Sequence, residues 1–189
     1  MSEAGAAVLD RPEAAAAPVA THDMSVRRAL LWLLLPFVVI FGGRAIIAEP
    51  FKIPSTSMVP TLAAGDHVVA NKLAYRFGSP HVGDIAVLES PGNGEVLVKR
   101  IVALGGQRVE IRDGVLFVDR RPRREAYVDY DMVDGFFFGP ARVPQGAVFV
   151  MGDARGDSED SRKFGAVPRD DLIGRVDLRI LPLSRFGAL

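Results

Sequence analysis

Apolar side chains follow two patterns along this chain: one unbroken run near the N-terminus, and many short runs after it. Residues 29–43 contain no charged side chain, and with residues 44–48 they make a stretch of 20. A helix of that length rises about 30 Å, which matches the hydrocarbon core of a bilayer. Its one charge, on Arg44, lies near an end, where a long side chain can reach the headgroups. The pattern predicts one transmembrane helix over residues 27–48.

The residues on either side of this apolar run do not fix the orientation of the predicted helix in the membrane. Residues 1–26 are rich in Ala, Pro and acidic side chains, and they predict a disordered tail because few large apolar groups offset the entropy of ordering. A buried soluble helix and a cleaved signal peptide are alternatives to a permanent anchor, but the long acidic tail and the poor cleavage site disfavour the second. Two arginines precede the run, and Arg44 and Lys52 follow it, so charge leaves the orientation open.

Beyond residue 48 the pattern changes to short β-branched and apolar runs separated by Gly, Pro, Asn and Asp. The Asp113-Gly114 pair between two such runs is the strongest hairpin signal. No long amphipathic helix pattern and no repeat occurs there. Residues 49–189 are therefore predicted to form one mainly antiparallel β domain. The expected strands cover residues 67–73, 84–88, 96–102, 108–111, 115–118, 147–151 and 175–181.

Composition removes several kinds of chemistry. The 189 residues include 23 basic and 23 acidic side chains and no cysteine. A thiol nucleophile, disulfides and thiolate-bound metals are excluded, and a net charge of zero disfavours nucleic-acid binding. The histidines, His22, His67 and His81, lie in no motif and fit surface positions better than a Ser-His-Asp site. A nucleophilic hydroxyl in this chain would need another base.

Three short stretches carry residues that could react. The first, residues 53–62, holds Ser55, Thr56 and Ser57 between two prolines, which narrow the directions in which the hydroxyl groups point. Hydroxyl side chains also fill ordinary loops after membrane helices. This stretch alone leaves both interpretations open.

The second stretch, residues 96–102, is a predicted strand whose faces are apolar apart from one cation each. Alternation places Lys99 on one face and Arg100 on the other. Burial disfavours the ammonium, so the pKa of such a lysine falls and makes it a usable base. The guanidinium stays charged and needs a buried acidic partner. The alternative is an edge strand whose lysine guards against aggregation.

The third stretch, residues 151–165, is dense in Asp, Ser, Arg and Gly. It could be a solvated loop. Its carboxylates could also bind calcium, but their spacing does not fit a calcium-binding loop. The remaining interpretation is a loop whose carboxylates and arginines pair with one another and with Arg100.

Taken together, these stretches resemble the bacterial type I signal peptidase family in its compact, single-anchor form. The matching segments are residues 49–62, 83–85, 99–106 and 152–165. The resemblance implies a membrane-bound serine endopeptidase with a Ser/Lys dyad, which removes signal peptides from exported preproteins by cutting after Ala-x-Ala. It also implies a single-pass protein of the plasma membrane, with a cytoplasmic N-terminus and an extracytoplasmic antiparallel β catalytic domain, residues 49–189.

The same resemblance implies roles for individual residues. Ser57 is expected to be the nucleophile and Lys99 the general base, while Ser55 joins the Ser57 amide in the oxyanion hole and Ser158 orients the lysine through a hydrogen bond. No metal or cofactor is implied, and the expected partners are signal peptides and the lipid bilayer, with no nucleic acid and a monomeric chain. The implied ion pairs are Asp153 with Arg100 and Asp160 with Arg162, and the implied pocket residues are Phe51, Ile53, Met58, Leu62 and Val98.

The third stretch departs from the family pattern at Ala154, Gly156 and Asp157. A carboxylate at position 157 would raise the pKa of the lysine if the two lie close together. Two alternatives to the peptidase remain, an inactive homologue that acts as an anchored binding module, or another Ser/Lys protease such as the self-cleaving repressors. The aromatic run 136–138 fits either a core strand or an apolar tip that enters the membrane.

Overall fold

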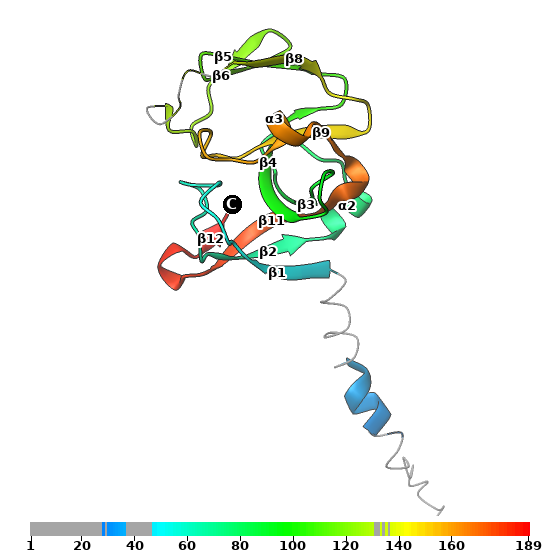
Figure 1. The fold of residues 1–189 in the computed structure, drawn as a ribbon. Coiled ribbons are helices and arrows are strands. Elements are labelled where there is room, and N and C mark those ends of the chain that lie inside the picture. The colour runs from blue at the N-terminus through cyan, green and yellow to red at the C-terminus, as the bar shows by residue number, and fades with distance from the viewer. Residues whose placement is uncertain (1–27, 29, 37–46, 131–132, 134, 136) are drawn as a thin grey trace, which may run out of the picture.

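The computed structural model describes residues 28, 30–36, 47–130, 133, 135 and 137–189. They form two antiparallel sheets, which confirms the mainly β fold that the short apolar runs predicted (Figure 1). The expected tail, residues 1–26, and most of the expected membrane helix lie outside the described residues. Among those described, no helix has both the length and the hydropathy needed to cross a bilayer.

The larger sheet has eight strands and includes the one that carries Lys99. Its strands are β1 (Ala48–Lys52), β2 (His67–Asn71), β3 (Ile85–Glu89), β4 (Val96–Leu104), β9 (Ala147–Met151), β10 (Val167–Pro168), β11 (Leu172–Leu181) and β12 (Gly187–Ala188). The order is β1-β2-β11-β3-β4-β9-β10, and β12 pairs with β11. All five residues of β9 are buried, which explains why that strand reads as a continuous apolar run rather than an alternating one.

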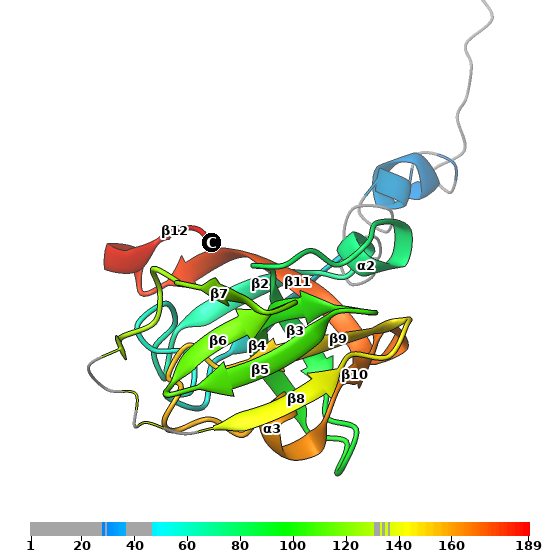
Figure 2. The same cartoon turned by 90° about the horizontal axis from the view of Figure 1, so that it is seen from above.

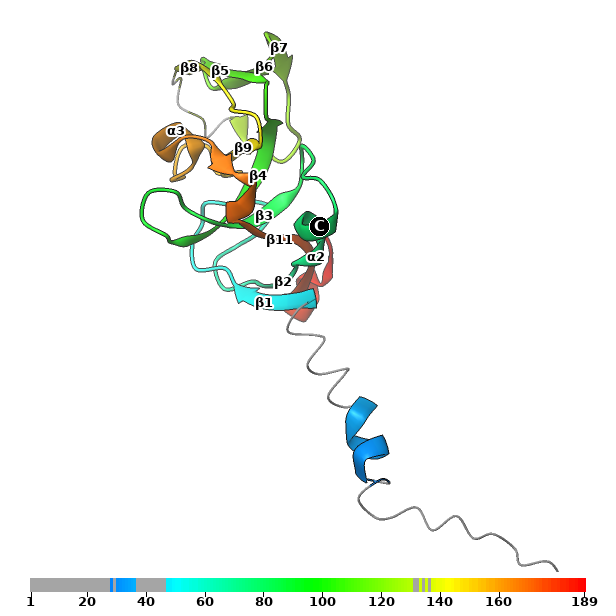
Figure 3. The same ribbon diagram turned by 90° about the vertical axis from the view of Figure 1, so that its right-hand side faces the viewer.

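The smaller sheet has four strands in the order β7-β6-β5-β8, side by side in the view from above (Figure 2). These are β5 (Arg108–Arg112), β6 (Val115–Val118), β7 (Arg121–Arg123) and β8 (Phe138–Arg142). The turn between β5 and β6 is the predicted one, because Asp113 and Gly114 both have positive φ, 49° and 74°. Figures 1 and 3 place this sheet at the end of the molecule opposite β1.

Three apolar clusters form the core of the described residues. One packs the inner face of the small sheet against β4 and β9. Another joins β3, β4, β9 and β11. The remaining cluster brings Ile53, Met58 and Leu62, from the segment after β1, onto β2, β3 and β11. These three side chains are at most 2% exposed, so they fix the backbone on both sides of Ser57.

The aromatic run 136–138 is divided by the fold. Phe138 begins β8 and packs into the core, with its ring centre 5.5 Å from that of Phe149. Phe137 is 74% exposed, and Phe136 lies outside the described residues. Phe138 therefore belongs to a core strand, whereas membrane contact by its neighbour stays a hypothesis.

Every expected strand is present, with ends that agree to within about three residues. The expected strand 67–73 ends early because helix α2 (Leu73–Phe77) begins there. The expected strands do not include β1, β7, β10 or β12, and β8 was anticipated only as one of two alternatives for residues 136–138. β1 starts at Ala48, so the expected membrane helix over residues 27–48 is wrong at its last residue, and β7 reads Arg-Pro-Arg, with no alternation to detect. The other short helices are α3 (Ser161–Phe164), η2 (Arg169–Asp171) and η3 (Leu183–Arg185).

Candidate active site

Ser57 lies in a tightly held segment between β1 and β2. A hydrogen bond joins the two ends of the segment: the backbone N–H of Ile53 donates to the carbonyl of Asp66 at 2.8 Å. Its apolar side chains point into the core, as described above, while Ser57 is only 8% exposed. The neighbouring hydroxyl of Ser55 lies 3.2 Å from Ser57 Oγ. The fold therefore places the hydroxyl groups of Ser55 and Ser57 side by side.

Lys99 reaches this hydroxyl from β4. Its Nζ donates a hydrogen bond to Ser57 Oγ at 2.7 Å, although 42 residues separate the two in sequence. The lysine is 3% exposed, so the interpretation of a solvent-facing lysine on an edge strand is wrong. Its register explains the placement, because β3 pairs with β4 over Val96–Arg100, whereas β9 pairs with it only from Arg100 onward. At Lys99 the second edge of β4 faces the serine.

Burial shifts the pKa of Lys99 downward. Desolvation lowers it, while the carboxylates of Asp160, Glu159 and Asp157 raise it and the nearby guanidinium of Arg162 lowers it. The net direction is down, because loss of hydration outweighs the attraction of the carboxylates. A larger share of the lysine is therefore neutral near pH 7 than in water, and a neutral amine can accept a proton from the adjacent hydroxyl.

Ser158 does not make the hydrogen bond expected of it. Its Oγ is buried and has no hydrogen-bond partner among the described residues. This hydroxyl and the carbonyl of Ser57 both lie close to Gly152. The structure thus brings Ser158 to the site without the direct contact to Lys99 that the family resemblance implied.

Arg100 and Asp153 form a buried ion pair beside the dyad. The guanidinium donates to the two carboxylate oxygens, from Nε at 2.9 Å and from Nη2 at 2.7 Å. Thr61 donates to the same carboxylate at 2.5 Å, and Arg100 donates to the carbonyl of Gly83 at 2.8 Å. Burial lowers the pKa of Arg100, but the hydrogen bond and charge of Asp153, together with Tyr127 and Glu125, outweigh burial and leave the pKa raised. This pair ties the third stretch to the nucleophile segment.

A second ion pair, between Asp160 and Arg162, shapes the third stretch itself. Arg162 donates to Asp160 from Nε at 2.7 Å and from Nη2 at 2.8 Å. The same carboxylate accepts the backbone N–H of Arg162 as the N-cap of α3, and that of Gly152 at 3.0 Å. The loop is further held by the N–H of Ala154, which donates to the carbonyl of Ser57 at 3.1 Å.

Three further residues complete this network, and sequence reasoning missed them. The Cζ atom of Arg100 lies 3.9 Å from the centre of the Tyr127 ring, a cation–π contact. The Tyr127 hydroxyl donates to Glu125 at 2.5 Å, Glu125 pairs with Arg155, and Arg155 donates to the carbonyl of Gly152 at 3.1 Å. The only signal in the sequence is that a buried guanidinium needs partners, and this requirement does not identify residues 125 and 127.

A cleft of about 230 Å³ opens beside the dyad. One wall follows β1 into the serine segment, and the other is the unpaired edge of β4. Leu62, an expected pocket residue, does not line the cleft, because its side chain is fully buried in the core cluster with Ile53 and Met58. The other expected pocket residues do line it: Phe51, Ile53, Met58 and Val98, together with Lys52, Pro54, Ser55, Ser57, Val96, Leu97 and Lys99.

Known proteins match this sequence over most of its length. The model of the family described as "Signal peptidase, peptidase S26" matches residues 26–181. A probable signal peptidase I-1 of Synechocystis sp. is 37% identical over 185 residues, which cover 91% of each chain. Signal peptidase I of Mycobacterium tuberculosis is 33% identical, over 87% of this chain and 76% of that protein. A solved signal peptidase I of Enterococcus faecalis is 31% identical and covers 51% of this chain and 96% of its own, with a TM-score of 0.47.

These matches identify the class of protein as a serine peptidase, a hydrolase. The chain belongs to the signal peptidase family, peptidase S26. This confirms the family that the three sequence stretches resembled and disfavours the repressor-type alternative.

Gly152 tests how tightly the site is packed. A Cβ on this residue would lie 2.5 Å from the carbonyl oxygen of Ser57 and closer still to Ser158 Oγ. We expect Gly152→Ala to lower the free energy of unfolding by about 1–3 kcal/mol, because an overpacked side chain forces the backbone apart. Urea denaturation measures the change. Gly92→Ala is the matched control, since a Cβ there meets no atom within 4 Å. Equal stability of the two variants would contradict the packing described here.

Proposed function

We propose that this protein is a membrane-bound endopeptidase that removes N-terminal signal peptides from exported preproteins, with Ser57 as nucleophile and Lys99 as general base. One observation carries the proposal: the 2.7 Å hydrogen bond between a buried lysine and a buried serine at the end of a cleft. The relatives named signal peptidase support the choice of substrate class.

The reaction follows from the positions of these groups. Neutral Lys99 accepts the Ser57 proton as Oγ attacks the scissile carbonyl carbon, which gives a tetrahedral intermediate. The Ser57 amide and the Ser55 hydroxyl would stabilise its oxyanion. Protonated Lys99 then gives its proton to the leaving amine, and an acyl-enzyme remains on Ser57. Water activated by Lys99 hydrolyses that ester and frees the serine.

The shape of the cleft favours an extended peptide with small side chains as the substrate. The edge of β4 over residues 96–99 has no strand partner on the cleft side among the described residues, so an extended peptide can add to it as a strand. Alternate side chains of such a peptide would point toward Phe51, Ile53 and Val98. A cleft of about 230 Å³ shared along a backbone has room for small side chains, which favours cleavage after Ala-x-Ala.

Membrane attachment and topology are part of the proposal. Residues 27–47 would form a single transmembrane anchor in the plasma membrane, with residues 1–26 in the cytoplasm and the β domain outside it. Such an anchor would end where β1 begins, the strand that precedes the nucleophile segment. A monomer suffices, because both dyad residues come from one chain. Ser158 would orient Lys99 after a rotation of its side chain.

Replacing either dyad residue tests the activity itself. We expect Ser57→Ala and Lys99→Met each to reduce cleavage of a preprotein whose signal ends in Ala-x-Ala by about 10⁴- to 10⁶-fold, because neither residue acts without the other. The detergent-solubilised full chain is incubated with the preprotein, and the new N-terminus of the product is sequenced.

Ser79→Ala and Lys163→Ala are controls of the same residue types at exposed positions, and both should cleave at the wild-type rate. Wild type that cuts no faster than the dyad variants would overturn the proposal and leave an anchored binding module.

The pH profile tests the environment of the lysine. Lys99 must be neutral to act as the base, so kcat/KM rises as the pH passes its pKa. The Asp157 carboxylate raises that pKa, so Asp157→Asn should move the rise to lower pH. Asp170→Asn, an exposed substitution of the same kind on η2, should leave the profile unchanged. Superimposable profiles for wild type and Asp157→Asn would show that this carboxylate does not act on the lysine.

A further inference from the structure

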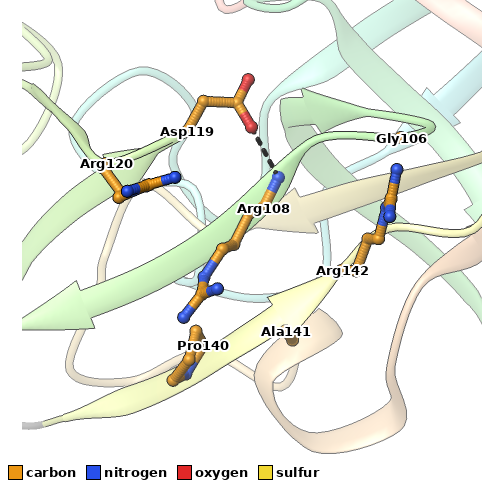
Figure 4. Close-up of a pocket in the computed structure, with 7 residues that line it drawn as sticks. All are labelled: Gly106, Arg108, Asp119, Arg120, Pro140, Ala141 and Arg142. Atoms are coloured by element: carbon orange, nitrogen blue, oxygen red, sulfur yellow. Dashed lines mark hydrogen bonds between the residues drawn. The ribbon is translucent and has the colours of Figure 1, made fainter.

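The outer face of the small sheet carries a second cavity, of about 400 Å³, that the peptidase reaction does not use. Three arginines stand in its wall: Arg108 from β5, Arg142 from β8, and Arg120 from the turn between β6 and β7 (Figure 4). The small sheet lies at the end of the molecule opposite β1 (Figures 1 and 3). The cavity is therefore separate from the cleft beside Ser57.

Positive charge is concentrated on this sheet. Residues 106–124 and 138–142 contain seven arginines and three carboxylates, within a chain whose net charge is zero. One of the carboxylates, Glu110, is already paired with Arg112 at 2.7 Å. The sheet therefore attracts anions, although the protein as a whole is neutral.

The carboxylate within the cavity does not neutralise its arginines. Asp119 accepts the backbone N–H of Arg108 at 2.9 Å and the side-chain amide of Gln107 at 3.3 Å. No salt bridge to the guanidinium groups of Arg108, Arg120 and Arg142 forms in the part of the chain that the structure describes. Three charged groups with strong donors thus surround one cavity.

The fold brings these cations together at an energetic cost. Arg108 and Arg142 stand directly opposite each other in the β5–β8 pair, where like charges destabilise a sheet. Arg120 has φ of +66° and Asp119 φ of +52°, left-handed conformations that residues other than Gly seldom adopt. In Figure 4 the side chains of Arg108 and Arg142 point in opposite directions along the cavity, which keeps their guanidinium groups apart.

We propose that this cavity binds a phosphate group. A guanidinium fork matches phosphate oxygens in geometry, and a phosphate group offers up to about two negative charges and three strong acceptors to three arginines. The three side chains are exposed, so each can turn toward a shared anion. In the topology proposed above, an anchor over residues 27–47 would hold β1, not this sheet, beside the host bilayer. We therefore assign a phosphate ester outside that bilayer, rather than one of its own headgroups, as the ligand.

The test measures phosphate binding to the full chain in uncharged detergent. Inorganic phosphate is titrated at constant ionic strength, and the arginine Nε–H resonances are followed by NMR. Saturable binding is expected for wild type, with an affinity at least about tenfold lower for the triple variant Arg108→Gln/Arg120→Gln/Arg142→Gln. The control, Arg121→Gln/Arg123→Gln/Arg124→Gln, removes the same charge from β7 and the residue after it, and it should bind as wild type does.

Two further measurements distinguish a specific phosphate site from non-specific attraction to positive charge and from binding of lipid headgroups. Arg142→Gln alone should weaken binding yet leave the free energy of unfolding equal or higher, because it removes the like-charge opposition. Micelles doped with phosphatidylglycerol replace free phosphate in a second arm, with phosphatidylcholine as control. Binding only to the phosphatidylglycerol micelles would overturn the assigned source. Absence of saturable phosphate binding, or equal loss in both triple variants, would overturn the site. None of these results depends on catalysis by Ser57.

Discussion

The burial of one cation determines how this site is built. Lys99 is 3% exposed within an apolar strand, and its Nζ lies 2.7 Å from Ser57 Oγ, where the proposed reaction needs it to accept a proton. Loss of hydration lowers its pKa, and the carboxylates of the third stretch oppose that shift without reversing it. The chain has no cysteine, and its described histidines lie outside the cleft, so in the proposed mechanism this balance decides whether the serine can be activated.

The other buried charges around Ser57 and Lys99 hold the segments of the site in position. The contacts of Asp153 and Asp160 join the segment after β1, the strand β4 and the loop after β9, which are far apart in sequence. Buried ion pairs add little net stability, but removing one partner leaves an uncompensated charge that costs about 3–5 kcal/mol. Arg100 is held by Asp153 on one side and by the Tyr127 ring on the other, so its position has little freedom. Because Lys99 is the adjacent residue in β4, this restraint on Arg100 also restrains the position of the Lys99 backbone.

Sequence reasoning reached the parts of the fold and site that depend on local pattern. Alternation in residues 96–102 placed the two cations on opposite faces, and the Asp113-Gly114 turn was recognised from its residue types alone. Parts that depend on tertiary contacts were beyond it. Leu62 was expected to line the pocket and is core instead, and the partnership of Tyr127 with Arg100 has no local signature. The strand β7 has no alternation of apolar and polar residues, so only its pairing with β6 defines it.

The central claim, that desolvation keeps Lys99 available as a base, can be measured directly. The chain has four lysines, at positions 52, 72, 99 and 163, so the side-chain ¹³Cε signals of labelled lysine can be followed individually through a pH titration. Comparison with Lys99→Met assigns the signal of interest. The structure predicts that the Lys99 signal titrates at lower pH than an unperturbed lysine side chain, because burial lowers its pKa. Titration of the Lys99 signal at or above the ordinary lysine pKa of about 10.4 would contradict the account.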